Sequence, residues 1–198
     1  MTFARLETKY GIVVGRFQPL HLGHLEYLEA ARARCDRLVI GVTNPDVANL
    51  IDDSADLNRS RPENNPFSYF DRHEMIIASM IENGWNVEEF TVVPADINRI
   101  HSLEATLPPP SKAIVFVTIY DDWGDRKNDL LSGMGYQVEV MWRRTMVDRL
   151  TSGTAIRGAI RSGEPWKHLV PSSVASYLEG SHLNTAHAGW PSNETSAP

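Results

Sequence analysis

Residues 10–34, YGIVVGRFQPLHLGHLEYLEAARAR, join an apolar run that ends at a glycine to a stretch with leucines at helical spacing. The first part, 10–15, is almost wholly apolar and indicates a strand that is buried on both faces. The second part, 22–34, predicts an amphipathic helix, because apolar residues recur every three positions: Leu22, Leu25, Leu28 and Ala31. A buried strand that leads directly into such a helix is the start of a βαβ unit.

The same alternation continues along the chain. Apolar runs predict four more strands at 37–43, 89–93, 113–118 and 137–141, and helical patterns occur at 68–83, 127–132, 154–162 and 172–178. Ser68 is placed to cap the helix 68–83, and Gly84 is placed to end it. We therefore predict an α/β fold with a Rossmann-like, doubly wound, five-stranded parallel sheet, helices on both faces and a small C-terminal helical appendage.

Length and composition are those of one domain with a short extension. We assign 1–180 of the 198 residues to the domain and 181–198, small and polar, to a disordered tail or an arm ordered by a partner.

The formal net charge is −6, which argues against a general nucleic-acid binder. Cys35 is the single cysteine, so a disulfide framework within the chain and a cysteine-rich zinc site are excluded. No apolar run approaches a membrane span, and we expect a cytoplasmic protein. A homo-oligomer is compatible with the sequence.

The turn between the first strand and the first helix, GRFQPLHLGH at 15–24, carries the sharpest chemical pattern. His21 and His24 are three residues apart, so both rings can face one side of a first helical turn. Unpaired N–H groups and the helix dipole at that end attract anions. Gly15 and Gly23 let the backbone approach a ligand, and Arg16 adds a cation. Alone, each feature is ordinary; together at one strand-to-helix turn they predict a polyphosphate site.

A second pattern, TSGTAIR at 151–157, lies near the other end of the domain. Ser152 or Thr154 can cap a helix, and Arg157 follows Thr154 by three residues. Hydroxyls, helix-start amides and a guanidinium again make an anion site. By itself this stretch would indicate only a helix cap with a surface arginine, but paired with the first turn it favours phosphate binding.

These residues resemble the nucleotidylyltransferase superfamily, whose signatures are an (H/T)xGH motif and a later (S/T)xxxxR-type motif. Within it, the archaeal-type nicotinamide-nucleotide adenylyltransferases match best, in four ordered blocks: 15–28, 65–76, 93–97 and 152–171. The resemblance implies a Rossmann-like core with Mg²⁺-ATP as the donor. It also implies attack of a nucleotide phosphate on the α-phosphate of that donor, with release of pyrophosphate.

Site roles follow from the same resemblance. The catalytic residues would be His21, His24 and Arg157, which stabilise charge on the phosphates. The donor nucleotide would contact Gly15, Arg16, Phe17, Met146, Asp148, Arg149, Ser152 and Thr154. The acceptor would contact Arg72, Asn98 and His101. No side chain is expected to ligate a metal, because Mg²⁺, the expected cofactor, would be carried by the phosphates.

Two stretches depart from the adenylyltransferase pattern. Residues 98–101 read NRIH, so an imidazole stands where that family has a tryptophan near the nicotinamide. Residues 118–125, TIYDDWGD, together with Arg144 and Thr145, are similar to the glycerol-3-phosphate cytidylyltransferase branch of the superfamily. The polar loop at 44–64 is also longer than the pattern, and is either a lid or clamp over the ligand edge or a surface insertion.

The sequence thus leaves three functions. The first is transfer of AMP from Mg-ATP to a mononucleotide, nicotinamide mononucleotide above all, giving NAD. The alternative is cytidylyl or adenylyl transfer, from CTP or ATP, to another phosphate or phosphonate acceptor in specialised metabolism. The third is a non-catalytic nucleotide sensor that keeps the pocket. A pyrophosphate-release assay separates them.

Overall fold

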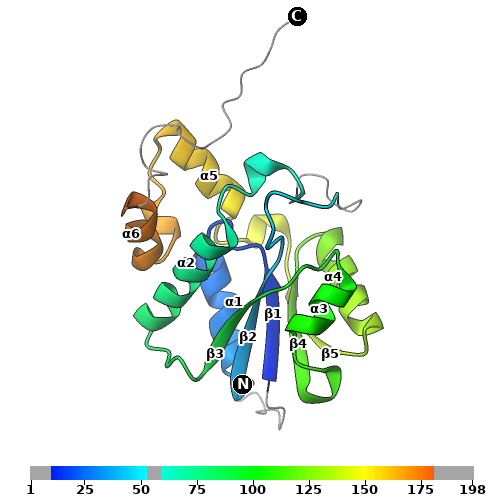
Figure 1. Ribbon diagram of the computed structural model, residues 1–198. Coiled ribbons are helices and arrows are strands. Elements are labelled where there is room, and N and C mark those ends of the chain that lie inside the picture. Colours follow the sequence, from blue (N-terminus) through cyan, green and yellow to red (C-terminus); the bar gives the residue numbers. More distant parts are fainter. Residues whose placement is uncertain (1–9, 53–58, 181–198) are drawn as a thin grey trace, which may run out of the picture.

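The computed structural model describes residues 10–52 and 59–180. Its centre is a five-stranded sheet in which all neighbouring strands are parallel, in the order β3-β2-β1-β4-β5 (Figure 1). The strands are β1 (Tyr10–Gly15), β2 (Arg37–Val42), β3 (Phe90–Pro94), β4 (Ala113–Ile119) and β5 (Gln137–Arg143). The predicted α/β fold with a doubly wound sheet is confirmed.

Helices cover both faces of the sheet. They are α1 (Leu22–Arg32), α2 (Tyr69–Glu82), α3 (Ile100–Thr106), α4 (Asp122–Gly133), α5 (Gly153–Ser162) and α6 (Ser172–Gly180). Successive side chains of a strand point to opposite faces. In β1, Val13 therefore belongs to the core shared with α1, α2, α5 and α6, whereas Ile12 and Val14 belong to the core under α3 and α4. Two apolar layers thus hold one sheet.

The C-terminal part forms the predicted helical appendage. The helix α6 packs along α2, and α5 lies beyond the end of the strands (Figure 1). Ile156 of α5 and Val174 of α6 are fully buried in the α1–α2 core, which anchors both helices to the domain. The predicted tail, 181–198, and residues 1–9 of the predicted domain lie outside the described residues. Within the described ranges, no helix has the length and apolarity needed to cross a membrane.

Most boundaries of helices and strands follow local signals. Ser68 caps α2 in a reciprocal capping box with Asp71, and Gly84, with φ of 76°, follows its C-terminus, as predicted. Two helices differ from expectation. The predicted helix at 127–132 starts earlier, at Asp122, because the side chain of Asp121 caps α4. The short helix α3 was not predicted, because Leu103 is its one buried residue and it shows no apolar stripe.

The strand order places the ligand edge. From β1 the chain proceeds to β2 and β3 on one side, and then to β4 and β5 on the other, so the order reverses between β1 and β4. In such sheets ligands bind beyond the carboxyl ends of the strands at that point. The turns that follow Gly15 of β1 and Ile119 of β4 line a cleft of about 170 Å³ at this position.

Candidate active site

The β1–α1 turn is held in a strained but well-supported shape. Phe17 has φ of 50°, a conformation that a bulky residue rarely adopts, and its ring is completely buried. Next to it, the Gln18 side chain exchanges two hydrogen bonds with the backbone of Phe67: its Nε2 donates to the carbonyl at 2.9 Å, and its Oε1 accepts from the N–H at 3.0 Å. These contacts hold the backbone of the turn in place just before His21 and His24.

The two histidines lie at the start of α1 with their rings stacked. His21 is the N-cap of the helix, and its Nδ1 accepts the His24 backbone N–H at 3.2 Å. Ring centroids are 3.7 Å apart and the planes differ by 19°. Because Nδ1 of His21 accepts, the proton of the neutral ring is on Nε2. Nδ1 of His24 is buried and makes no hydrogen bond to the described residues, as expected for a group whose partner is a ligand.

Both rings are neutral near pH 7 in the free protein. Burial lowers the pKa of His21 to about 3, with the positive charges of Arg149 and Arg157 adding to the effect. Burial also lowers the pKa of His24 far below its usual value, as do His21, Arg16, Arg149 and Lys127 in turn. Neutral imidazoles surrounded by cations are hydrogen-bond donors in a positive field. This arrangement suits anionic oxygens.

The second motif meets this turn directly. The Ser152 side chain caps α5 by accepting the Ala155 N–H at 3.2 Å. One turn further, Arg157 is 1% exposed, and its Nη1 donates to the Gln18 carbonyl at 2.7 Å. Close packing makes glycine necessary at 153, where a Cβ atom would lie 2.6 Å from the Gln18 carbonyl oxygen. Two stretches almost 140 residues apart in the sequence therefore form one site.

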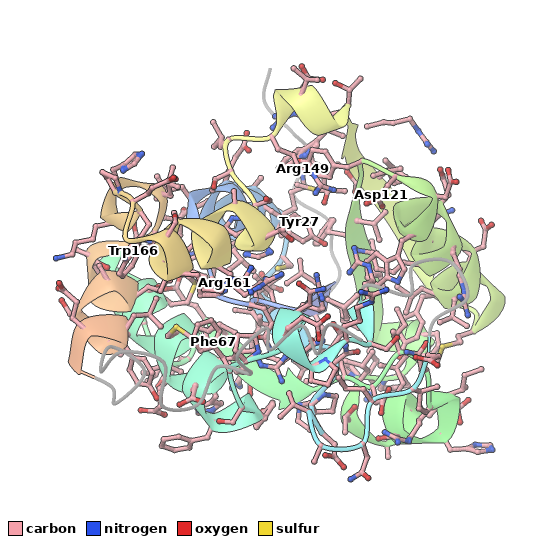
Figure 2. The ribbon with its side chains drawn as sticks, turned by 90° about the horizontal axis from the view of Figure 1, so that it is seen from above. Tyr27, Phe67, Asp121, Arg149, Arg161 and Trp166 are labelled. Carbon is pink, nitrogen blue, oxygen red and sulfur yellow. The ribbon has the colours of Figure 1, made fainter. Side chains whose placement is uncertain are left out.

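The cleft concentrates positive charge in an acidic chain. Among the described residues that line it, five are basic and one is a carboxylate, Asp121. The basic residues are Arg16, Arg59, Lys127, Arg149 and Arg157. Figure 2, seen from above, shows Arg149 and Asp121 on the side of the cleft nearer α4, across from α5; Nη2 of Arg149 is 3.3 Å from Oδ2 of Asp121. An excess of cations at a concave site attracts polyphosphates.

Lys127 and Arg59 are site residues that sequence reasoning missed. Lys127 is 4% exposed, its Nζ lies 3.5 Å from the Val14 carbonyl, and burial lowers its pKa to about 7, with Arg59 adding to the effect. The guanidinium carbon of Arg59 lies 3.6 Å from the centre of the Trp123 ring. No motif marks either residue. A lysine on the buried face of a predicted helix was the one available signal.

Most of the predicted site residues line the cleft: Gly15, Arg16, Phe17, His21, His24, Arg149, Ser152, Thr154 and Arg157. Asn98 lines a smaller neighbouring recess. His101 does not line either cavity; its side chain is fully exposed and lies 3.4 Å from Glu104. Asp148 is exposed and bonded to Thr145, away from the cleft lining. Met146 lies in a short 3-10 helix, Met146–Asp148, and nothing further is described of its side chain.

Arg72, expected at the acceptor, has a structural role instead. It is fully buried, and its guanidinium donates to four backbone carbonyls at 2.7–3.1 Å. Those carbonyls belong to Arg16, Thr43, Asn44 and Ser68. They come from the ends of β1 and β2 and the start of α2. Its donors are therefore directed at the backbone, and Arg72 joins the segments that present the cleft residues.

Replacing Arg72 with methionine is therefore expected to act on folding. The variant leaves four carbonyls, three part-buried and that of Thr43 buried, without their charged donor. Each such hydrogen bond is worth about 1.5–3 kcal/mol. We expect the free energy of unfolding, measured by urea denaturation, to fall by at least about 3 kcal/mol. An unchanged denaturation midpoint would contradict the role of Arg72 in holding the loop ends.

A model of the family described as cytidylyltransferase-like matches residues 12–159, which contain both histidines, the cleft between β1 and β4, and Arg157. The chain belongs to the cytidylyltransferase-like family. It is a nucleotidylyltransferase. The superfamily resemblance drawn from the two motifs is thus confirmed.

Two relatives define this nucleotidylyltransferase more closely. It is 46% identical over 171 residues to the phosphonoformate cytidylyltransferase of Streptomyces viridochromogenes, covering 85% of this chain and 90% of that one. It is 31% identical over 175 residues to the nicotinamide-nucleotide adenylyltransferase of Thermococcus onnurineus, covering 86% and 82%. The similarity to archaeal-type adenylyltransferases is therefore real, but it is weaker than the similarity to a cytidylyltransferase.

Solved structures confirm the fold. The bifunctional NMN adenylyltransferase/ADP ribose pyrophosphatase of Francisella tularensis superposes with a TM-score of 0.61 at 13% identity, over 89% of this chain and 51% of that one. A putative nicotinate-nucleotide adenylyltransferase of Vibrio parahaemolyticus gives a TM-score of 0.53 at 14% identity, over 86% and 99%. At such identities the likeness extends to the fold alone.

The cleft lining of this nucleotidylyltransferase offers one carboxylate to a divalent metal ion. The family typically uses a divalent metal. Residues 10–52 and 59–180 contain no group of three or more His, Cys, Asp or Glu side chains able to hold one. Asp121 is the one carboxylate of the cleft lining, and it already caps α4 and contacts Arg149. Asp121 is therefore the lining residue that could contact a divalent cation bound together with phosphates.

Proposed function

We propose that this enzyme transfers CMP from CTP to a small phosphonate acceptor and releases pyrophosphate. The observation that carries the proposal is the 46% identity to a phosphonoformate cytidylyltransferase over 85% of this chain. The position of His101 also supports it, because this residue, expected beside a pyridine acceptor, is exposed and lines neither the cleft nor the recess. The adenylyl transfer to nicotinamide mononucleotide that the resemblance first implied has the weaker support of relatives at about 30% identity.

In this reaction no side chain has to act as a nucleophile. An acceptor phosphonate oxygen, already anionic, forms a bond to the α-phosphorus of CTP. The bond from that phosphorus to the oxygen bridging the α- and β-phosphates breaks, and pyrophosphate leaves with the electron pair. Catalysis is then mainly positioning and charge stabilisation. The protein's task is to hold two anions together and to stabilise charge at the α-phosphate.

The residues of the cleft divide this work. Nε2–H of His21 and the ring of His24 donate to non-bridging oxygens of the α-phosphate. Arg157 and Arg149, which influence the pKa of His21, bind the phosphates that leave as pyrophosphate. A divalent cation, Mg²⁺ in our proposal, would neutralise phosphate charge, with Asp121 the nearest carboxylate. Donors that strengthen their contacts at the transition state are worth about 10²–10³ in rate each.

A pyrophosphate-release assay tests the proposal. Each of the four nucleoside triphosphates is combined in turn with phosphonoformate, nicotinamide mononucleotide and glycerol 3-phosphate. Turnover is expected with CTP and phosphonoformate. Turnover confined to ATP and nicotinamide mononucleotide would replace the proposal with the adenylyltransferase. Binding of CTP without release for any acceptor would indicate a nucleotide-binding module.

CTP binding is also expected to take up a proton at Lys127. In the free protein the pKa of this buried amine is about 7, so it is mostly neutral at pH 8. A polyanion beside it stabilises the charged form and raises the pKa. Titration calorimetry at pH 8 in two buffers of different ionisation enthalpy should therefore show uptake of up to one proton. Equal uptake by the Lys127→Met variant would show that the proton goes elsewhere.

A further inference from the structure

A small recess opens beside the cleft and is separated from it by Arg16, Arg59 and Trp123, which line both. Thr43 and Asn98 line the recess but not the cleft. Its volume is about 10 Å³, which is room for about one water-sized group. A pyridine or other base does not fit this space. An oxygen of a carboxylate does.

Thr43 lines the recess and carries a buried polar group without a partner among the described residues. The residue follows β2 and is 1% exposed. Its Oγ1 is buried and finds no hydrogen-bond partner in the described part of the chain. A buried hydroxyl without a partner costs folding free energy. Such a group in the wall of a cavity is explained when a ligand supplies the missing hydrogen bond.

The cationic wall of the recess is fixed by the loop backbone. The Arg59 carbonyl accepts the Asn44 side-chain amide at 3.0 Å and that of Asn65 at 2.7 Å. The Asn44 carbonyl is in turn held by Arg72 at 2.7 Å. The Arg59 guanidinium stacks on Trp123, and Nζ of Lys127 lies 5.2 Å from the centre of the same ring. The side chain of Arg59 is therefore placed before any ligand arrives.

Cations surround the stacked histidines. After burial itself, Arg149 and Arg157 lower the pKa of His21, and Arg16, Arg149 and Lys127 lower that of His24. A transfer reaction needs anion sites on both sides of the α-phosphate, one for the leaving pyrophosphate and one for the acceptor. Arg16 and Arg59 line both the cleft and the recess, so cations lie where the two cavities adjoin.

We propose that the recess receives an oxygen of the second anionic group of the acceptor, the carboxylate of a carboxyphosphonate, while the phosphonate lies in the cleft beside His24. This inference rests on the proposed function. One carbon–phosphorus bond joins the two groups, so they require adjoining anion sites. The Arg59 guanidinium and the Thr43 hydroxyl donate to the carboxylate. The stack of Arg59 on Trp123 keeps the recess too small for the base of a mononucleotide.

The test of this site combines an acceptor that lacks the carboxylate with protein variants that lack the groups proposed to bind it. Methylphosphonate keeps the phosphonate of phosphonoformate but lacks the carboxylate. With CTP as donor, Arg59→Met is expected to lower kcat/KM about 100-fold for phosphonoformate and less than about fivefold for methylphosphonate. Thr43→Val, which keeps the shape of the side chain, should lower kcat/KM for phosphonoformate about tenfold without lowering the melting temperature.

Arg61→Met is the matched control. Arg61 lies in the same loop, but its side chain is 59% exposed and near Glu63, so kcat/KM should stay within about twofold for both acceptors. Calorimetry adds a second readout: because four other basic residues of the cleft remain, Arg59→Met should weaken CTP binding no more than about threefold relative to the wild-type Kd. An equal loss for the two acceptors, no loss for either, or weakened CTP binding would overturn the carboxylate site while leaving cytidylyl transfer intact. Absence of pyrophosphate release from the wild-type protein with CTP and phosphonoformate would overturn both.

Discussion

His24→Ala is expected to lower kcat at least about 100-fold while the melting temperature stays within a few degrees of the wild type. The ring lies between His21 and Phe17, with centroid distances of 3.7 and 4.8 Å, and its Nδ1 has no hydrogen-bond partner among the described residues. Its removal loses packing, but it also removes an unsatisfied buried polar atom from a positive field. The transition state loses a donor to the α-phosphate, which is worth about 10²–10³ in rate.

His101→Ala is the control for this variant. Its side chain is fully exposed, so both turnover and melting temperature should remain at wild-type values. Pyrophosphate release and differential scanning fluorimetry on the two variants give the comparison. If His24→Ala turned over within twofold of the wild type, the catalytic assignment of the histidine pair would be wrong. A large loss of turnover in His101→Ala would instead support the original prediction that His101 contacts the acceptor.

Arg157→Met is expected to reduce both turnover and stability, in contrast to His24→Ala. Its guanidinium lies in the cleft and donates to the Gln18 carbonyl at 2.7 Å and to Oδ1 of Asn64 at 2.8 Å. Loss of the charge facing the phosphates should lower kcat about 100-fold or more. Loss of donors to buried acceptors should lower the free energy of unfolding by about 2 kcal/mol or more.

The matched control is Arg161→Met. Arg161 lies one turn further along α5 and is exposed, so its loss should change kcat less than about twofold. Urea denaturation gives the stability difference, and initial rates at a temperature where both proteins are folded give the catalytic one. If Arg157→Met kept full activity but lost stability, Arg157 would have only a structural role, joining α5 to the β1–α1 turn. Arg157→Lys should recover little, since a lysine cannot reproduce the forked contacts.

The sequence left two interpretations of the loop between β2 and α2. Its length and polarity fit a ligand clamp as well as a surface insertion. In the structure its Arg59 lies at the cleft on Trp123, held through Asn44 and Asn65, whereas Arg61 is turned to solvent. Neighbouring arginines of one loop thus have opposite surroundings, and nothing in the local sequence distinguishes them.

The sequence by itself determined the sheet, most of the helices and the two turns that meet at the cleft. Those features depend on residues within a few positions of one another: apolar periodicity, the Ser68 and Ser152 caps, and histidines three apart on one turn. Where the spacing of apolar residues was not clearly helical, the sequence did not predict the structure: α3 was missed entirely, and α4 was predicted to start too late.

Only the tertiary structure decided which charged side chains serve the site. Arg72 is turned inward to four carbonyls, His101 outward to solvent, and Lys127 into the cleft beneath Trp123. An arginine, histidine or lysine has the same local preference in each of these places. Its role depends on the field and the acceptors that other segments bring to it, and those segments lie tens of residues away in the chain and meet only when the sheet is assembled.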